Sequence, residues 1–109
     1  MKVDEKIKDL CRQIVENFQP EKVILFGSHA YGKPDVNSDV DLLVVMPFEG
    51  RSVRQAIKIR QNISNRMPLD LLVRTPNQIK ERLRLNDFFI KEVIERGKIL
   101  YESGNARMD

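Results

Sequence analysis

With 109 residues, the chain is long enough for one domain with a single modest core. Its composition of 41% apolar and 32% charged residues is typical of a globular protein, and a net charge of +3 is too small to indicate a nucleic-acid-binding surface. Cys11 is the only cysteine, so an intrachain disulfide and a cysteine-rich zinc site are excluded. No apolar stretch is long enough to span a membrane, so we expect a cytoplasmic protein without a membrane segment.

The first half of the chain predicts one helix and two strands around a short turn. Apolar residues three and four positions apart mark one face of an amphipathic helix over residues 3–18. A short apolar run at residues 22–26 is too short for a buried helix and predicts a strand that is covered on both faces, and residues 39–46 predict a second strand with two aspartates at its start. Between the two strands, residues 28–32 are expected to form one helical turn with Ser28 as its cap.

The second half of the chain alternates helices and strands again. Residues 51–67 predict a moderately amphipathic helix with a basic outer face, and residues 69–73 predict a third strand. Thr75 has the position of a helix cap, because a proline follows it at the first helical position. Two helical segments come next and end at Gly97, a typical helix stop, and residues 98–101 predict a last short strand.

This order of elements predicts an α/β (α+β) fold in which helices flank a small mixed sheet. The pattern assigns helices to one face of the sheet and leaves the cover of the opposite face undetermined. We expect residues 1–102 to form a single domain and residues 103–109 to form a disordered tail, because the tail has no apolar periodicity.

Three aspartates in or beside the predicted strands are candidate metal ligands. Side chains alternate along a strand, so Asp39 and Asp41 project from the same face and repel each other. A hard divalent cation removes this repulsion, and Mg²⁺ typically binds one or two carboxylates together with phosphate oxygens and water. If the third strand lies beside the second, Asp70 would join them at a site for two Mg²⁺ ions, or would act as a general base toward an acceptor hydroxyl.

A turn of small residues ahead of these acids supplies a candidate phosphate site. Gly27 allows the backbone to approach a ligand closely, and the helix start after it presents free amides to an anion. The Ser28 hydroxyl can donate a hydrogen bond to a terminal phosphate oxygen. Gly27-Ser28, ten intervening residues and then Asp39-x-Asp41 together favour a site for a metal-bound phosphate chain.

Each of these residues also has a simpler interpretation. Asp39 alone could cap a turn, and Asp70 alone could pair with Arg66 or Arg74. His29, the only histidine, is interpreted as a loop residue, because the chain offers no second histidine or cysteine for a metal site with it. Four cations of the basic helix are interpreted as a solvated face or a partner surface: Arg51, Arg54, Lys58 and Arg60.

In their order and spacing, these residues resemble the nucleotidyltransferase superfamily that includes DNA polymerase beta and kanamycin nucleotidyltransferase. The chain more closely resembles the minimal nucleotidyltransferase (MNT) domain proteins of prokaryotes. The family pattern is Gly-Ser, about ten residues, Asp-x-Asp and a third acid on a later strand. It is met here by Gly27, Ser28, Asp39, Asp41 and Asp70. The resemblance covers nearly the whole chain and implies the nucleotidyltransferase fold.

The resemblance implies a Mg²⁺-dependent enzyme that transfers AMP from ATP to an acceptor hydroxyl. Asp39 and Asp41 would bind Mg²⁺, Ser28 would hold the triphosphate, and Asp70 would complete the metal site or activate the acceptor. In MNT proteins the acceptor is thought to be a tyrosine of a partner HEPN-domain toxin, so this chain would be an antitoxin and could assemble with that partner. Many relatives have an arginine where this chain has His29.

Two other functions are compatible with the sequence. The chain could neutralise its partner sterically, as a non-catalytic binding module, with residues 51–67 and 88–90 as its interface. It could also transfer a nucleotide to a small molecule such as an antibiotic. A direct nucleic-acid partner is not expected, because the excess of basic residues is small and spread along the chain.

Overall fold

The chain forms helices and strands in the order that its sequence predicts. The structure, a computed structural model, describes residues 3–35, 37–65 and 67–104. Within these ranges the elements are α1 (Val3–Phe18), β1 (Lys22–Phe26), α2 (Ser28–Tyr31), β2 (Val40–Val45), α3 (Ser52–Gln61), β3 (Leu69–Arg74), α4 (Pro76–Arg84), α5 (Phe88–Arg96) and β4 (Lys98–Glu102).

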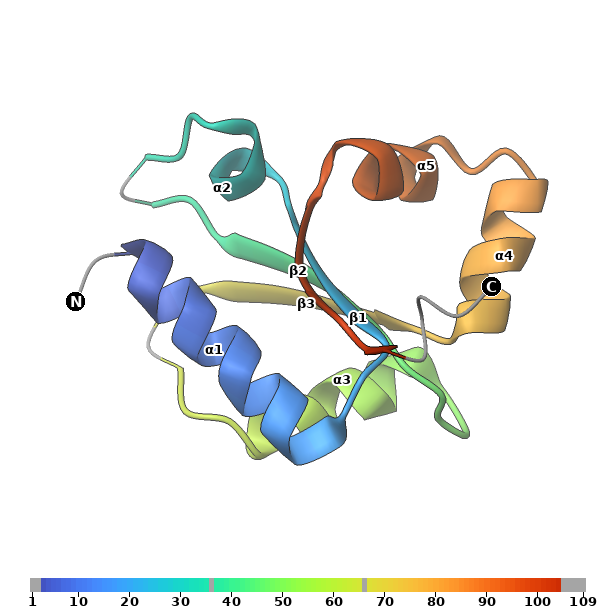
Figure 1. Ribbon diagram of the computed structural model, residues 1–109, viewed down its shortest axis with the longest axis horizontal. Coiled ribbons are helices and arrows are strands. Elements are labelled where there is room, and N and C mark those ends of the chain that lie inside the picture. Colours follow the sequence, from blue (N-terminus) through green and yellow to red (C-terminus); the bar gives the residue numbers. More distant parts are fainter. Residues whose placement is uncertain (1–2, 36, 66, 105–109) are drawn as a thin grey trace.

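The strands form one mixed sheet in the order β3-β2-β1-β4 (Figure 1). β1 pairs antiparallel with both β2 and β4, whereas β2 and β3 are parallel. A parallel pair needs a long crossover between its strands, and α3 supplies it. The small mixed sheet flanked by helices that we predicted is therefore confirmed.

Helices cover both faces of the sheet. α1 and α3 lie on one face, and α4 and α5 lie on the other, which answers the question that the sequence left open (Figure 1). The cluster on the α1 side contains Ile7, Leu10, Cys11, Ile14, Val23, Leu25, Val40, Leu42, Val44, Met46, Ile59, Leu71 and Val73. The cluster on the α5 side contains Ile24, Phe26, Leu43, Val45, Ile79, Ile90 and Val93.

β2 lies inside the sheet and divides its side chains between the two clusters. Leu42 and Val44 pack on the α1 side, whereas Leu43 and Val45 pack on the α5 side. This alternation explains why the strand reads as a continuous apolar run. By the same alternation, Asp41 near the start of β2 projects toward the face that α4 and α5 cover.

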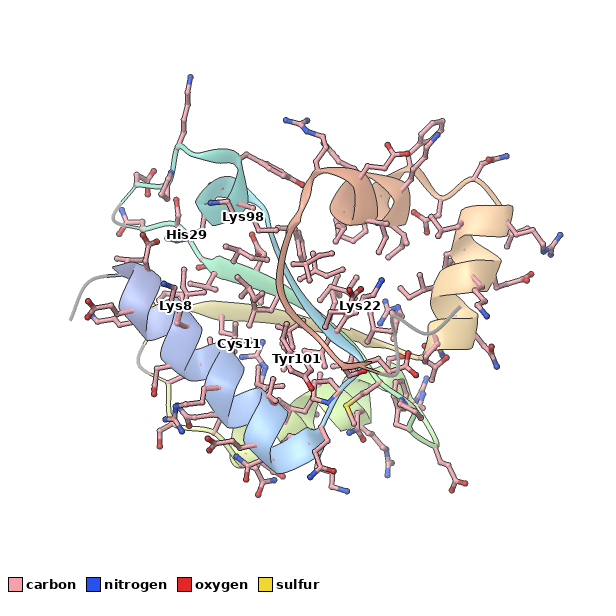
Figure 2. All side chains as sticks on the ribbon, viewed as in Figure 1. Lys8, Cys11, Lys22, His29, Lys98 and Tyr101 are labelled. Carbon is pink, nitrogen blue, oxygen red and sulfur yellow. The ribbon has the colours of Figure 1, made fainter. Side chains whose placement is uncertain are left out.

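Cys11 is a buried core residue on the inner side of α1, as its sequence position predicts (Figure 2). Burial raises the pKa of its thiol to about 11. The thiol therefore stays protonated near neutral pH, and Cys11 acts as a small apolar side chain.

Several predicted element bounds were wrong by one to six residues, and three of them concern the site or the helix beside it. Gly27, not Ser28, is the N-cap of α2, and Ser28 is its first helical residue. β2 begins at Val40, so Asp39 lies just before the strand rather than within it. α3 ends at Gln61 instead of residue 67.

The early end of α3 has a tertiary cause. The backbone amide of Ser64 donates to Oε1 of Gln13 at 2.7 Å, and Nε2 of Gln13 donates to the Ser64 carbonyl at 3.0 Å. These bonds to α1 satisfy backbone groups that a longer helix would have paired internally. Apolar periodicity could not reveal these two hydrogen bonds, because Gln13 and Ser64 are far apart in the chain.

The predicted signals around α4 and α5 are confirmed. Thr75 caps α4 through a capping box, in which its Oγ1 accepts from the Gln78 amide at 3.0 Å and Oε1 of Gln78 accepts from the Thr75 amide at 2.9 Å. Gly97 ends α5, and its amide donates to the Val93 carbonyl at 2.9 Å. Such caps satisfy backbone groups that a helix end leaves unpaired.

The tail predicted at residues 103–109 is described only at its start. The Ser103 amide donates to the Glu21 carbonyl at 2.8 Å, which ties the end of β4 to the start of β1. Residues 105–109 lie outside the described residues, so the division into a domain and a tail stays a prediction. No helix in the described part of the chain has both the length and the apolar composition that a membrane crossing requires.

Replacing Gly97 with alanine should lower the free energy of unfolding by about 1–3 kcal/mol, because the methyl group would overpack a closed junction. A Cβ there would lie 2.7 Å from Cγ2 of Ile24 and 2.9 Å from the carbonyl oxygen of Leu25. The Gly97 φ of −68° suits alanine, so backbone strain contributes nothing. Urea unfolding followed by circular dichroism measures the loss. Gly104→Ala is the matched control, since its Cβ would enter open space; equal stability of both variants would contradict the prediction.

Candidate functional site

Two of the predicted aspartates face each other across the parallel strand pair. Asp41 and Asp70 are each the second residue of their strand, and they are in direct register between β2 and β3. Residues in register on neighbouring strands project from the same face of a sheet. Both carboxylates therefore lie at one end of the sheet, on the face that also carries Phe26, the partner of Asp41 on β1.

Asp39 lies at the same end of the sheet, in the connection that enters β2. It is exposed, and its charge acts on Asp41. As they stand, no three His, Cys, Asp or Glu side chains of the described residues are close enough together to hold a metal ion by themselves. The three acids form an open set with Asp41 in the middle, rather than a closed cage.

Asp41 is the least exposed of the three acids. Its pKa is raised, first because burial disfavours the charged carboxylate and then because Asp70 and Asp39 repel it. His29 acts in the opposite direction and lowers the pKa of Asp41. This end of the sheet therefore has a negative potential that favours a bound cation.

Gly27 brings the turn after β1 into contact with Asp41. It has a φ of 74°, in the left-handed region that favours glycine. A Cβ on Gly27 would overlap with Oδ2 of Asp41. The Gly27 carbonyl accepts from the Ala30 and Tyr31 amides, both at 3.0 Å, which fixes the start of α2 beside the carboxylate.

Ser28 follows this turn as the first residue of α2 and is half-buried. The first amides of a helix have no partner within the helix, so they remain open to an anion. Since Gly27 contacts Asp41, these amides and the Ser28 hydroxyl begin one residue away from the acids. The predicted phosphate site and the predicted metal ligands are thus neighbours in space.

His29 lies closer to the acids than the sequence indicated. Its Nε2 is 3.2 Å from the Ser38 carbonyl, so Nε2 donates in that bond and the ring is held where β2 begins (Figure 2). It is also close enough to Asp41 to affect its pKa. The interpretation of His29 as a loop residue is wrong, because His29 lies in α2. Its position directly after Gly27-Ser28 is the sequence signal for a place in the site.

An aromatic contact joins α2 to α5 beside the site. The Arg96 guanidinium lies 4.8 Å from the centroid of the Tyr31 ring, a distance typical of a cation–π interaction. This contact holds the far end of α2 against the helix that precedes β4. Sequence reasoning did not find it, because no local pattern links residues that far apart.

The simpler interpretation of Asp70 finds no support in the described residues. Nη1 of Arg74 donates to the Val73 carbonyl at 2.8 Å instead of to Asp70. Arg66, the other proposed partner, lies outside the described residues. Asp70 is exposed and forms no ion pair within the described part of the chain. Its carboxylate is therefore available to a ligand.

The donor set of this site fits Mg²⁺ better than a softer metal. It consists of carboxylate oxygens, with no thiolate and with one imidazole that is already bonded to Ser38. Mg²⁺ prefers oxygen ligands and usually keeps several waters or phosphate oxygens, so an open set of acids is enough to hold it. Asp39, Asp41 and Asp70 are the residues that could hold such an ion.

A family model and several solved structures match the chain. The model described as a nucleotidyltransferase domain matches residues 5–100. A chain described as a nucleotidyltransferase from Sulfolobus solfataricus has a TM-score of 0.64 and 22% sequence identity, over 90% of this chain and 78% of that chain. No curated protein matches.

Two further solved structures are of toxin–antitoxin complexes. One, with AMP-PNP, has a TM-score of 0.57 and 20% identity, over 95% of this chain and 77% of the other. The second is a mutant of the toxin–antitoxin MntA–HpeT, with a TM-score of 0.51 and 19% identity, over 96% of this chain and 77% of the other. At these identities the likeness shows a shared fold.

Gly27→Ala should destabilise the protein by about 1–3 kcal/mol, because the methyl group both strains the backbone and displaces the Asp41 carboxylate. Gly32→Ala is the matched control: its φ of 95° causes comparable strain, but its Cβ would meet no atom within 4 Å. Urea unfolding measures both variants. If both variants lose the same free energy of unfolding, backbone strain alone explains the loss and the predicted clash with Asp41 is contradicted.

Asp41→Asn should raise the melting temperature of the metal-free protein near neutral pH. Because the pKa of Asp41 is raised in the folded state, its contribution to stability is complete below the ordinary value of 3.8 and is lost as pH rises through the folded-state pKa. The neutral amide of asparagine avoids that loss, so the difference in melting temperature between the variant and the wild type should shrink toward zero in acid. Thermal unfolding in EDTA at several pH values measures it. Glu49→Gln, which alters an exposed carboxylate on a loop, should give no such trend.

Proposed function

The chain belongs to the nucleotidyltransferase domain family, and we propose that it is a member of the minimal (MNT) type that transfers AMP from ATP to a protein. The acceptor would be a tyrosine of a HEPN-type toxin, and the transfer would make this chain an antitoxin. The observation that carries this proposal is the register of Asp41 with Asp70 beside the Gly27 turn.

The acids and the turn would divide the binding of Mg²⁺ and ATP between them. Asp39, Asp41 and Asp70 would hold Mg²⁺, with two ions in the complete site, and the metal would neutralise charge on the triphosphate. Burial and then repulsion from Asp70 and Asp39 raise the pKa of Asp41, and a bound cation would relieve that repulsion. Gly27 and Ser28 would hold the terminal phosphates through backbone amides and the serine hydroxyl.

As the alternative to binding a second ion, Asp70 would activate the acceptor as a general base. It is exposed and has no ion pair among the described residues, so its carboxylate can reach a hydroxyl from outside the chain. The acceptor oxygen would form a bond to the α-phosphorus of ATP while the bond from that phosphorus to the bridging oxygen breaks. The hydroxyl proton would pass to Asp70, and pyrophosphate would leave.

Similarity to toxin–antitoxin structures supports a protein acceptor. One neighbour is a toxin–antitoxin complex with AMP-PNP, and this chain shares its fold over 95% of its length. We infer by this analogy that the transferred group is AMP and that the acceptor is a partner toxin. The HEPN class and the tyrosine target come from the resemblance of the motif to MNT antitoxins.

The double substitution Asp39→Asn/Asp41→Asn should lower AMP transfer by about 10³-fold or more, because both variants keep the shape of the side chain but lose the charge that holds the metal. The assay mixes the chain with Mg²⁺, α-labelled ATP and the protein encoded by the adjacent gene. Asp4→Asn/Glu5→Gln is the matched control, since it removes two exposed carboxylates from α1 and should retain activity.

Two results would contradict the proposal. A folded wild-type chain that labels nothing on its partner would exclude the transfer reaction. If the Asp39→Asn/Asp41→Asn variant still neutralises the toxin in cells as well as the wild type, then the chain acts as a steric antitoxin instead.

A further inference from the structure

The outer face of α3 carries positive charge without any acid to balance it. Residues 51–61 contain four basic residues and no aspartate or glutamate. Ile59 is fully buried against the sheet, which turns the basic residues outward, where all four are exposed. Three of them follow one stripe, with a spacing of three and four residues: Arg51, Arg54 and Lys58.

On each of the other long helices, an arginine forms an ion pair with an acid of the same helix. On α1, Arg12 pairs with Asp9 at 2.6 Å and with Glu16 at 3.0 Å. α4 and α5 form equivalent pairs within one helical turn, Arg84 with Glu81 and Arg96 with Glu92. In the part of the chain that the structure describes, none of the four α3 cations forms an ion pair. Cations four residues apart, such as Arg54 and Lys58, repel each other on a helix, and α3 has no acid of its own to offset that repulsion.

An apolar stripe runs beside the basic stripe. Val53 is 69% exposed and Ile57 is 49% exposed, and their spacing of four residues places them on one side of α3. Solvent alone does not favour two exposed aliphatic side chains next to unpaired cations. A partner helix with its own apolar residues and a flanking row of acids would complement both stripes.

The α3 surface ends next to the candidate active site. Nη2 of Arg60, in the last turn of α3, donates to the Leu69 carbonyl at 2.7 Å. Leu69 precedes Asp70 and is in register with Val40, the residue between Asp39 and Asp41. β3 is an edge strand, so a protein that lies along α3 can extend past this edge toward Asp41 and Asp70, which project from the opposite face of the sheet.

We propose that the outer face of α3 is the docking surface for the protein acceptor, which it recognises through an acidic, amphipathic helix. The proposal rests on the proposed function, because it assigns the acceptor of that reaction a binding surface. A nucleic acid is the less favoured occupant: phosphates would pair with the cations but leave Val53 and Ile57 uncovered, and α3 has no aromatic side chain for base stacking.

Reversal of two α3 charges tests the surface. Arg54→Glu/Lys58→Glu should weaken binding of the adjacent gene's protein by about tenfold or more, and Val53→Ser/Ile57→Ser should weaken it as well. The matched control is Lys80→Glu/Lys91→Glu, which reverses two exposed cations on α4 and α5 and should bind as the wild type does. Sedimentation velocity without ATP measures binding, and circular dichroism verifies that each variant is folded.

Measurement without nucleotide separates this surface from the transfer reaction. If the α3 variants bind as tightly as the control, the docking surface is wrong even where AMP transfer is observed. If binding depends on α3 but no AMP is transferred, the surface stands and the proposed reaction falls. A single-stranded RNA oligonucleotide is tested in parallel, and RNA binding that is lost on charge reversal while protein binding is retained would overturn the proposal.

Discussion

The parallel pairing of β2 with β3 places two carboxylates directly opposite each other, and the candidate site depends on this contact. Like charges in register on neighbouring strands destabilise a sheet, and the pKa of Asp41 is raised first by burial and then by repulsion from Asp70. A shift of one strand by one residue would move Asp41 to the opposite face from Asp70. The register is therefore a requirement both of the fold and of the chemistry.

The two-sided core supplies the energy that holds this register. Leu42, Leu43 and Val44 follow Asp41 with 0% exposure, and burial of each such side chain contributes about 1.5–3 kcal/mol. These contributions exceed what a pair of partly solvated carboxylates costs. Because β2 is packed on both faces, neither slippage nor rotation can relieve the repulsion. A bound cation can relieve it without any change in the fold.

In the function that we propose, the nucleotide and the acceptor would bind to different parts of the molecule that meet at one end of the sheet. The Gly27 turn and the acids would bind the nucleotide, and the hydrogen bond from Arg60 to Leu69 places the last turn of α3 near the same end of the sheet. The negative site suits a metal-bound triphosphate, whereas the basic helix suits an acidic protein. The separation of the two charges allows each ligand to be recognised by a surface of the opposite sign.

The sequence by itself determined the elements and the chemical types of the site residues. Helix periodicity, strand runs and the Thr75 cap are local patterns, so they predicted α1, β1, β3 and α4 closely. Asp39, Asp41 and Asp70 were found because charged residues in or beside apolar strands are exceptional. A different signal, a turn of small residues ahead of these acids, predicted Gly27 and Ser28, although the cap of α2 was assigned to the wrong residue of that pair.

Only the tertiary structure decided which of these residues meet. The register of Asp41 with Asp70, the contact of Gly27 with Asp41 and the cover of the second sheet face by α4 and α5 all join segments that are distant in the chain. The end of α3 was set in the same way, by Gln13 on α1. Local propensity carries no information about such pairs, because their energies arise only when the sheet brings the segments together.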